Sequence, residues 1–141
     1  MASATPIAAA TGLSIVTVPG LRERGLGVFE GLTREQAESH YPEQFRDHRS
    51  DRLDFAPTGG ETLAEHLART LNAVNTLALR HAGETIALVT HGGSLSMLFR
   101  AVLGIPFSTR RAYFVSNTAL NVFEHGPSGL TLVSWGDTGH L

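Results

Sequence analysis

Residues 85–94 read TIALVTHGGS, an apolar run that ends abruptly in a histidine and two glycines. The run predicts a strand, and the pattern over Leu95 to Leu103 predicts a helix after it. In an open α/β sheet the carboxyl ends of the strands face the ligand crevice, so this strand would deliver His91 to a functional rim. Gly92 and Gly93 would leave backbone N–H groups at the helix start open to an anion such as phosphate. The alternative is a helix-capping turn with an incidental histidine.

Composition limits the class of protein. The chain has 141 residues, 42% hydrophobic and 17% charged, which predicts one soluble domain over residues 1–141. A net charge of -2 without long charged blocks argues against nucleic-acid binding and against a membrane-binding patch. The chain has no cysteine, which excludes disulfides and thiolate sites. Because no signal peptide or membrane-spanning run is evident, we expect a cytoplasmic protein.

Local signals predict helices and strands that alternate early and antiparallel strands late. We predict the end of a helix at residues 7–11 with Gly12 as its C-cap, a strand at Ser14–Val18, a polar loop at Leu21–Leu32, a lid of two helical pieces starting at Thr33 and Pro42, a helix from Glu61 to about His81, and β-rich runs at Ala112–Val115, Ala119–Glu124 and Leu130–Trp135. Thr33 and Gln36 have the spacing of a capping box, and the turn at residues 125–129 predicts a hairpin between the last two runs. This order predicts a three-layer α/β/α fold with a mostly parallel mixed sheet.

Apolar periodicity selects a core. The long predicted helix places apolar residues on one face, and the strands and the helix after His91 add others. The expected core positions are Leu63, Leu67, Leu71, Val74, Leu88, Leu98, Val102, Val122 and Leu132.

Several short motifs occur together in one order along the chain. They are LRER at 21–24 with Gly27, EGLT at 30–33, GET at 60–62, VTHGG at 89–93, NTALNV at 117–122 and WGDTGHL at 135–141. In this order and spacing the chain resembles the histidine phosphatase superfamily, whose fold is that of phosphoglycerate mutase. The resemblance runs from about Pro6 to Leu141.

The resemblance implies phosphoryl transfer through a phosphohistidine. One histidine attacks phosphorus, a second histidine and two arginines surround the phosphoryl oxygens, and a carboxylic acid protonates the leaving group. Glu23 matches the family's acid and His91 its second histidine. The expected phosphate-binding residues are Arg22, Arg24, Gly92 and Gly93. This chemistry requires no metal and no cofactor.

The chain departs from the family pattern because no Arg-His-Gly triplet occurs in it. The resemblance places the nucleophilic histidine on a strand that precedes the helix ending at Thr11. We therefore expect Met1 to be an internal methionine of a longer reading frame, with the first strand of the sheet absent from this amino-terminally truncated chain. Such a chain would be marginally stable, and a homodimer could cover its unpaired strand edges.

Other polar residues receive structural interpretations. Glu61 with Arg69 is interpreted as an internal polar tie, and Glu30 with Gly31 as a turn. Glu23 has an alternative as a surface carboxylate paired with neighbouring arginines. The remaining histidines are expected at the surface, and no ligand spacing supports zinc. These histidines are His40, His48, His66, His81, His125 and His140.

Two classes of function stay open. The first is a phosphatase of small phosphate monoesters whose nucleophile lies outside this chain, with a phosphoglycerate mutase-type phosphotransferase as its variant. The second is an inactive relative that binds a phosphorylated ligand or a partner. We favour the phosphatase, because the segment between Thr33 and Thr58 is short for the closure that a mutase needs to exclude water. The expected partner is a small phosphorylated substrate.

Overall fold

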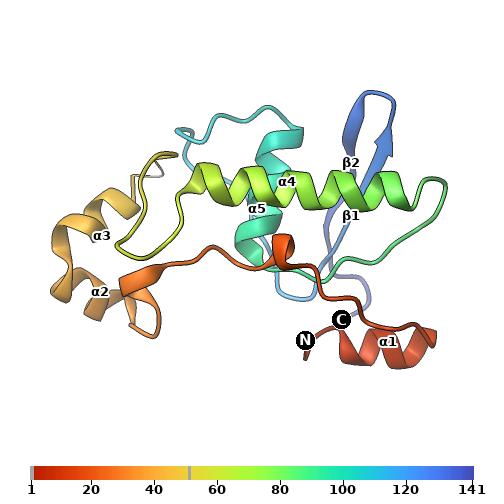
Figure 1. Cartoon of the computed structure of the whole chain (residues 1–141), viewed down its shortest axis with the longest axis horizontal. Coiled ribbons are helices and arrows are strands. Elements are labelled where there is room, and N and C mark those ends of the chain that lie inside the picture. Colours follow the sequence, from red (N-terminus) through yellow and green to blue (C-terminus); the bar gives the residue numbers. More distant parts are fainter. Residues whose placement is uncertain (1, 51) are drawn as a thin grey trace.

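The computed structural model describes residues 2–50 and 52–141. Its elements in chain order are α1 (Thr5–Thr11), the 3-10 turns η1 (Pro19–Leu21) and η2 (Gly27–Phe29), α2 (Arg34–His40), α3 (Pro42–His48), α4 (Leu63–Arg80), α5 (Gly92–Val102), β1 (Leu120–Gly126) and β2 (Gly129–Asp137). The long α4 helix lies along the middle of the molecule and α5 crosses it (Figure 1). The α2–α3 pair lies beyond one end of α4, and the β1–β2 hairpin lies toward the other.

Local capping chemistry forms the helices much as the sequence predicts. Thr33 and Gln36 close a capping box at the start of α2, with the Gln36 N–H 3.2 Å from Thr33 Oγ1. Thr62 and Glu65 close a second box at the start of α4, which the sequence reading did not identify. Gly12 takes the left-handed conformation at the end of α1, as predicted for a glycine C-cap. The structure therefore confirms the predicted helix that ends before Gly12 and the predicted helix that starts at Thr33.

The buried face of α4 differs from the predicted stripe. The buried residues are Leu63, His66, Thr70 and Val74, at spacings of three and four residues. Leu67 and Leu71 are only half-buried, so the face is rotated toward two polar side chains. The prediction that His66 lies at the surface is wrong, because this rotation places it against α5 with 1% of its surface exposed.

Two small apolar clusters hold the elements together. Leu21, Val74 and Leu98 join η1, α4 and α5, and the hairpin packs against them. Phe29 and Phe45 form a second cluster with Ala37 beneath α2 and α3. Full burial of such a side chain contributes about 1.5–3 kcal/mol. The first cluster fixes the start of α5 relative to the loop that follows η1.

The sheet is a two-stranded antiparallel hairpin in the described part of the chain. Gly126 pairs with Gly129 across a two-residue turn, and the register is irregular between Leu120 and Phe123. The predicted hairpin is confirmed. A mostly parallel mixed sheet in three layers is not observed among the described residues, and the fold is α/β at this coarser level.

Three predicted strands are wrong. Residues 14–18, 85–90 and 112–115 join no ladder in the described part of the chain, because a strand needs a hydrogen-bonded neighbour and none lies beside them. The predicted core residue Leu88, in one of these segments, is correspondingly exposed by 39%. The predicted core residue Val122 is 48% exposed although it lies in β1, because one face of the hairpin is open to solvent. Tyr113 instead stacks on Phe99, with ring centroids 4.4 Å apart. We refer to residues 13–18 and 85–90 as the ladder-free segments.

No helix in residues 2–50 and 52–141 is both long and apolar enough to cross a membrane.

Candidate active site

Glu23 lies in the loop after η1 and reaches the start of α5. Its Oε2 accepts the N–H of Gly93 at 3.0 Å, and its Oε1 accepts the N–H of Arg24 at 2.9 Å. A carboxylate at this end of a helix also interacts favourably with the helix dipole. The contact joins two motifs that are 70 residues apart in the chain. The side chain stays 41% exposed, so a ligand can reach it.

At position 93 the Glu23 carboxylate occupies the space that a side chain would take. A Cβ built on Gly93 would overlap Glu23 Oε1. A Cβ on Gly92 would meet only Val115 Cγ1, at an ordinary 3.7 Å. The two glycines therefore differ in role: Gly93 admits Glu23, whereas Gly92 opens the helix start. The Gly93 N–H, predicted to bind phosphate, donates to Glu23 in this structure.

His91 is the N-cap residue of α5. Its carbonyl accepts the Leu95 N–H at 3.0 Å, and its backbone is extended. Thr90 Oγ1 donates to the Leu21 carbonyl at 2.7 Å and ties the approach to His91 onto the Glu23 loop. The His91 imidazole is exposed at the same end of α5 as the Glu23 carboxylate.

Arg69 organises the loop that carries Glu23. Its guanidinium contacts both Glu61 oxygens, at 2.6 Å from Nε and 2.7 Å from Nη2. The same guanidinium donates to the carbonyls of Gly20, Arg22 and Glu23 at 2.8–3.0 Å. The hydrogen bond from Arg69 lowers the pKa of Glu61. The predicted polar tie between Glu61 and Arg69 is confirmed, and it also fixes the loop carbonyls.

The two arginines that flank Glu23 differ in how many of their N–H groups already donate to other protein atoms. Arg24 donates to the carbonyls of Glu61 and Phe55 at 2.7 and 2.8 Å, which holds two loops together. Arg22 is 57% exposed and touches Glu61 Oε1 at 3.3 Å. Phosphate binding by either arginine stays a prediction. The geometry favours Arg22, because the Nε and Nη2 groups of Arg24 already serve the fold.

The turn at Glu30 forms as predicted. Glu30 Oε1 accepts the Leu26 N–H at 3.0 Å, and Gly31 has a φ of 77°, which favours glycine. Glu30 therefore shapes the loop between Glu23 and the start of α2.

His66 is the site residue that the sequence reading missed. Its Nε2 lies 3.0 Å from Ser94 Oγ and 3.8 Å from Glu23 Oε1. Burial lowers the pKa of His66, and the positive charge of Arg69 adds to this effect. The signal was present in the sequence, since His66 and Thr70 share the helical face of Leu63 and Val74. The predicted apolar face ran through Leu67 and Leu71, which placed His66 at the surface.

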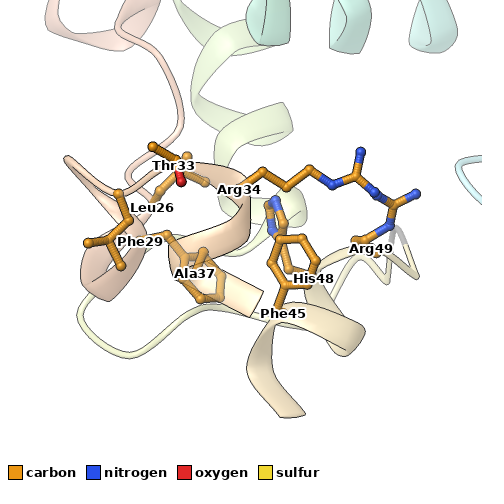
Figure 2. Close-up of a pocket in the computed structure, with 9 residues that line it drawn as sticks. Leu26, Phe29, Thr33, Arg34, Ala37, Phe45, His48 and Arg49 are labelled. Atoms are coloured by element: carbon orange, nitrogen blue, oxygen red, sulfur yellow. The ribbon is translucent and has the colours of Figure 1, made fainter. Parts of the chain in front are cut away.

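A pocket of about 290 Å³ lies apart from these residues, between η2, α2 and α3 (Figure 2). Its lining includes Phe29 and Phe45, and the guanidinium groups of Arg34 and Arg49 extend to one side of it. Neither Glu23 nor the start of α5 contributes to its lining. No cluster of three or more potential metal ligands occurs in residues 2–50 and 52–141.

Comparisons with known proteins give consistent matches. The family model described as "Histidine phosphatase superfamily (branch 1)" matches residues 1–138. Phosphoglycerate mutase-like protein 4 of Arabidopsis thaliana is 36% identical over 138 residues, covering 96% of this chain and 59% of that protein. The solved structure of Bacillus stearothermophilus YhfR has a TM-score of 0.86 at 29% identity, covering 99% of this chain and 69% of that one.

A mycobacterial glucosyl-3-phosphoglycerate phosphatase, solved in complex with VO3, is a further match. Its TM-score is 0.78 at 26% identity, and the superposition covers 96% of this chain and 71% of that chain. The matched proteins thus carry both phosphatase and mutase names. The chain spans 59% of the Arabidopsis relative.

Proposed function

The chain belongs to the histidine phosphatase superfamily, and on this premise we propose that Glu23 and His91 serve a phosphatase that hydrolyses small phosphate monoesters through a phosphohistidine. The observation that supports the proposal is the Glu23 carboxylate on the Gly93 N–H, beside His91 at the start of α5. The phosphoglycerate mutase-like fold of the matched structures is consistent with this placement.

Glu23 is the proton donor in this proposal. In the first step an imidazole nitrogen bonds to phosphorus, the ester P–O bond breaks, and protonated Glu23 gives its proton to the leaving oxygen. In the second step water attacks phosphorus, the N–P bond breaks, and the Glu23 carboxylate takes the proton from water. The products are an alcohol and phosphate, and Glu23 returns to its starting state.

His91 and the start of α5 stabilise the charge on the phosphoryl group. The His91 imidazole is exposed beside Glu23, and the helix start concentrates positive potential there. The attacking imidazole comes from an Arg-His-Gly segment, which residues 1–141 do not contain. Arg22, the more exposed of the two flanking arginines, is the candidate for an additional contact to phosphate.

Hydrolysis of p-nitrophenyl phosphate tests the proposal. The 141-residue chain is compared with a version carrying an amino-terminal Arg-His-Gly segment. In the active form, Glu23→Gln and His91→Ala should each lower kcat by about 10²–10⁴-fold. The matched controls Glu43→Gln and His125→Ala remove an exposed carboxylate and an exposed imidazole and should retain activity.

The product identifies the reaction class. Release of inorganic phosphate from a phosphoglycerate or its glycoside supports the phosphatase, whereas isomerisation without release would assign a mutase. Activity of the 141-residue chain alone, lost in Glu23→Gln and His91→Ala, would contradict the external nucleophile. Phosphate-ester binding without turnover in either form would favour an inactive relative.

A further inference from the structure

His66 is a buried titratable side chain that the proposed reaction does not use. It projects from α4 toward the first turn of α5, where Ser94 is fully buried. His66 Nε2 lies 3.0 Å from Ser94 Oγ and 3.8 Å from Glu23 Oε1, so the imidazole stands directly behind the proposed proton donor. An apolar residue would fill this space without presenting an N–H group to Glu23.

The hydrogen-bond pattern determines which ring nitrogen carries the proton. Ser94 has one hydroxyl hydrogen, and it points to the Arg22 carbonyl at 3.3 Å. Ser94 Oγ must then accept from His66, so Nε2 carries the hydrogen. Nδ1 is the bare nitrogen, buried without a partner among the described residues. Burial and the nearby arginines keep the ring neutral by lowering the pKa of His66.

The Nε2–H group has a second acceptor within reach. A separation of 3.8 Å from Glu23 Oε1 is too long for a hydrogen bond, but a small rotation of the His66 side chain closes it. The Gly93 N–H holds Glu23 Oε2 and the Arg24 N–H holds Oε1, so the carboxyl group is fixed in place and Oε1 keeps a lone pair for a second donor. A neutral N–H donor at this place favours the carboxylate that forms after Glu23 has given up its proton.

We propose that His66, oriented by Ser94, is a positioning residue for Glu23. Its Nε2–H moves between Ser94 Oγ and Glu23 Oε1 as Glu23 loses and regains its proton, and it holds the carboxyl group against Gly93. The inference rests on the proposed function of Glu23 as proton donor. The geometric coupling of His66, Glu23 and Gly93 is measurable without any turnover.

Nuclear magnetic resonance of the 141-residue chain tests the coupling directly. The His66 ring nitrogens should show a protonated Nε2 and a bare Nδ1. Glu23→Gln should shift the Nε2–H resonance, because its acceptor loses a charge, while the distant control Glu43→Gln leaves it unchanged. A ring protonated on Nδ1, or a Nε2–H resonance that ignores Glu23→Gln, would overturn the proposal.

The Gly93 amide gives an independent readout of Glu23 position. His66→Leu should move the Gly93 amide proton more than it moves the Gly92 amide proton, and His66→Gln should restore it by placing an amide N–H near the Nε2 position. Equal shifts in His66→Leu and His66→Gln would overturn the proposal and leave His66 a packing residue. Where His66→Leu fails to fold, Ser94→Ala must shift the His66 Nε2–H resonance, and no shift overturns the proposal.

The resonances and the hydrolysis assay together distinguish a failure of the proposed function from a failure of the positioning role of His66. Coupling without p-nitrophenyl phosphate hydrolysis would contradict the proposed function and leave the positioning intact. Hydrolysis without coupling would contradict only the positioning by His66.

Discussion

The Glu23 loop and the ladder-free segments are both built without a sheet, yet they differ in how they are ordered. Arg69 and Arg24 donate to loop carbonyls around Glu23, and Thr90 does so from the segment before His91. Most side chains of the ladder-free segments face solvent instead, with Val16 exposed by 78% and Val89 by 42%. Their last residues are partly covered, because Val18 packs against the first apolar cluster and Thr90 donates to the Leu21 carbonyl. Side-chain donors can thus order the site without strand pairing, whereas the apolar residues of segments that pair with no strand stay exposed to solvent.

The largest expected loss of stability comes from removing Arg69, whose guanidinium binds Glu61 and the carbonyls around Glu23. Arg69→Leu leaves the mostly buried Glu61 carboxylate with only the longer contact to the exposed Arg22, and it releases three loop carbonyls. We expect the free energy of unfolding to fall by about 3–5 kcal/mol. Urea denaturation measures this loss. Arg80→Leu, in the last turn of the same helix, is the matched control, and an equal loss in the two variants would contradict the special role of Arg69.

A smaller loss is expected where Glu23 meets α5. Gly93→Ala places a Cβ in the space of the carboxylate and must displace it from its hydrogen bonds to the Gly93 and Arg24 N–H groups, at a cost of about 1–3 kcal/mol. Gly92→Ala meets only an ordinary contact and has no such cost. Thermal unfolding of both variants makes the comparison. Indistinguishable melting temperatures would show that Glu23 does not occupy this position.

Lowering the pH should reduce the free energy of unfolding in two stages, the first set by His66 and the second by Glu61. Burial lowers the pKa of His66 from its usual 6.5, and the bond from Arg69 lowers that of Glu61 from 4.5. In each case the unfolded chain takes up a proton at a higher pH than the folded chain, so stability falls as pH falls. His66→Gln should abolish the loss below about pH 6.5, and Glu61→Gln the loss below about pH 4.5.

Urea unfolding at several pH values between neutral and acid tests both stages. The exposed His125→Gln variant is the control for the upper stage and should retain it. A wild-type stability that stays flat through the upper stage would mean that folded His66 accepts a proton as readily as the unfolded chain does.

The smallest effect is expected in the ladder-free segments. Val16→Thr changes an exposed side chain and should alter the free energy of unfolding by less than about 0.5 kcal/mol. Val74→Thr buries a hydroxyl in the core of α4 and should cost about 1–3 kcal/mol. A loss in Val16→Thr as large as in Val74→Thr would show that residues 13–18 are covered in solution. Sedimentation of the same sample would then reveal self-association.

The sequence predicted what local chemistry determines. The Thr33 capping box, the Gly12 cap and the hairpin turn each depend on residues within a few positions, and each is confirmed. The Glu61 and Arg69 tie is also local, since the two residues are only 8 positions apart in the chain. The family motifs added the long-range prediction that the region of Glu23 meets the region of His91.

The features that the sequence did not predict depend on contacts between residues far apart in the chain. Whether residues 85–90 form a strand depends on a neighbour that their own pattern does not encode. The three carbonyls that Arg69 holds carry no side-chain signature, so its organising role was not predictable. The burial of His66 depends on a small rotation of α4, which the apolar stripe through Leu67 concealed.

A double-mutant cycle between Glu23→Ala and Gly93→Ala tests most directly whether the Glu23 carboxylate rests on the start of α5. With the carboxylate removed, the Cβ at position 93 has room, so the cost of Gly93→Ala should largely disappear. The account predicts a coupling free energy of at least about 1 kcal/mol, and additivity within about 0.5 kcal/mol for Glu23→Ala with Gly92→Ala. Additive losses for Glu23→Ala and Gly93→Ala would contradict it.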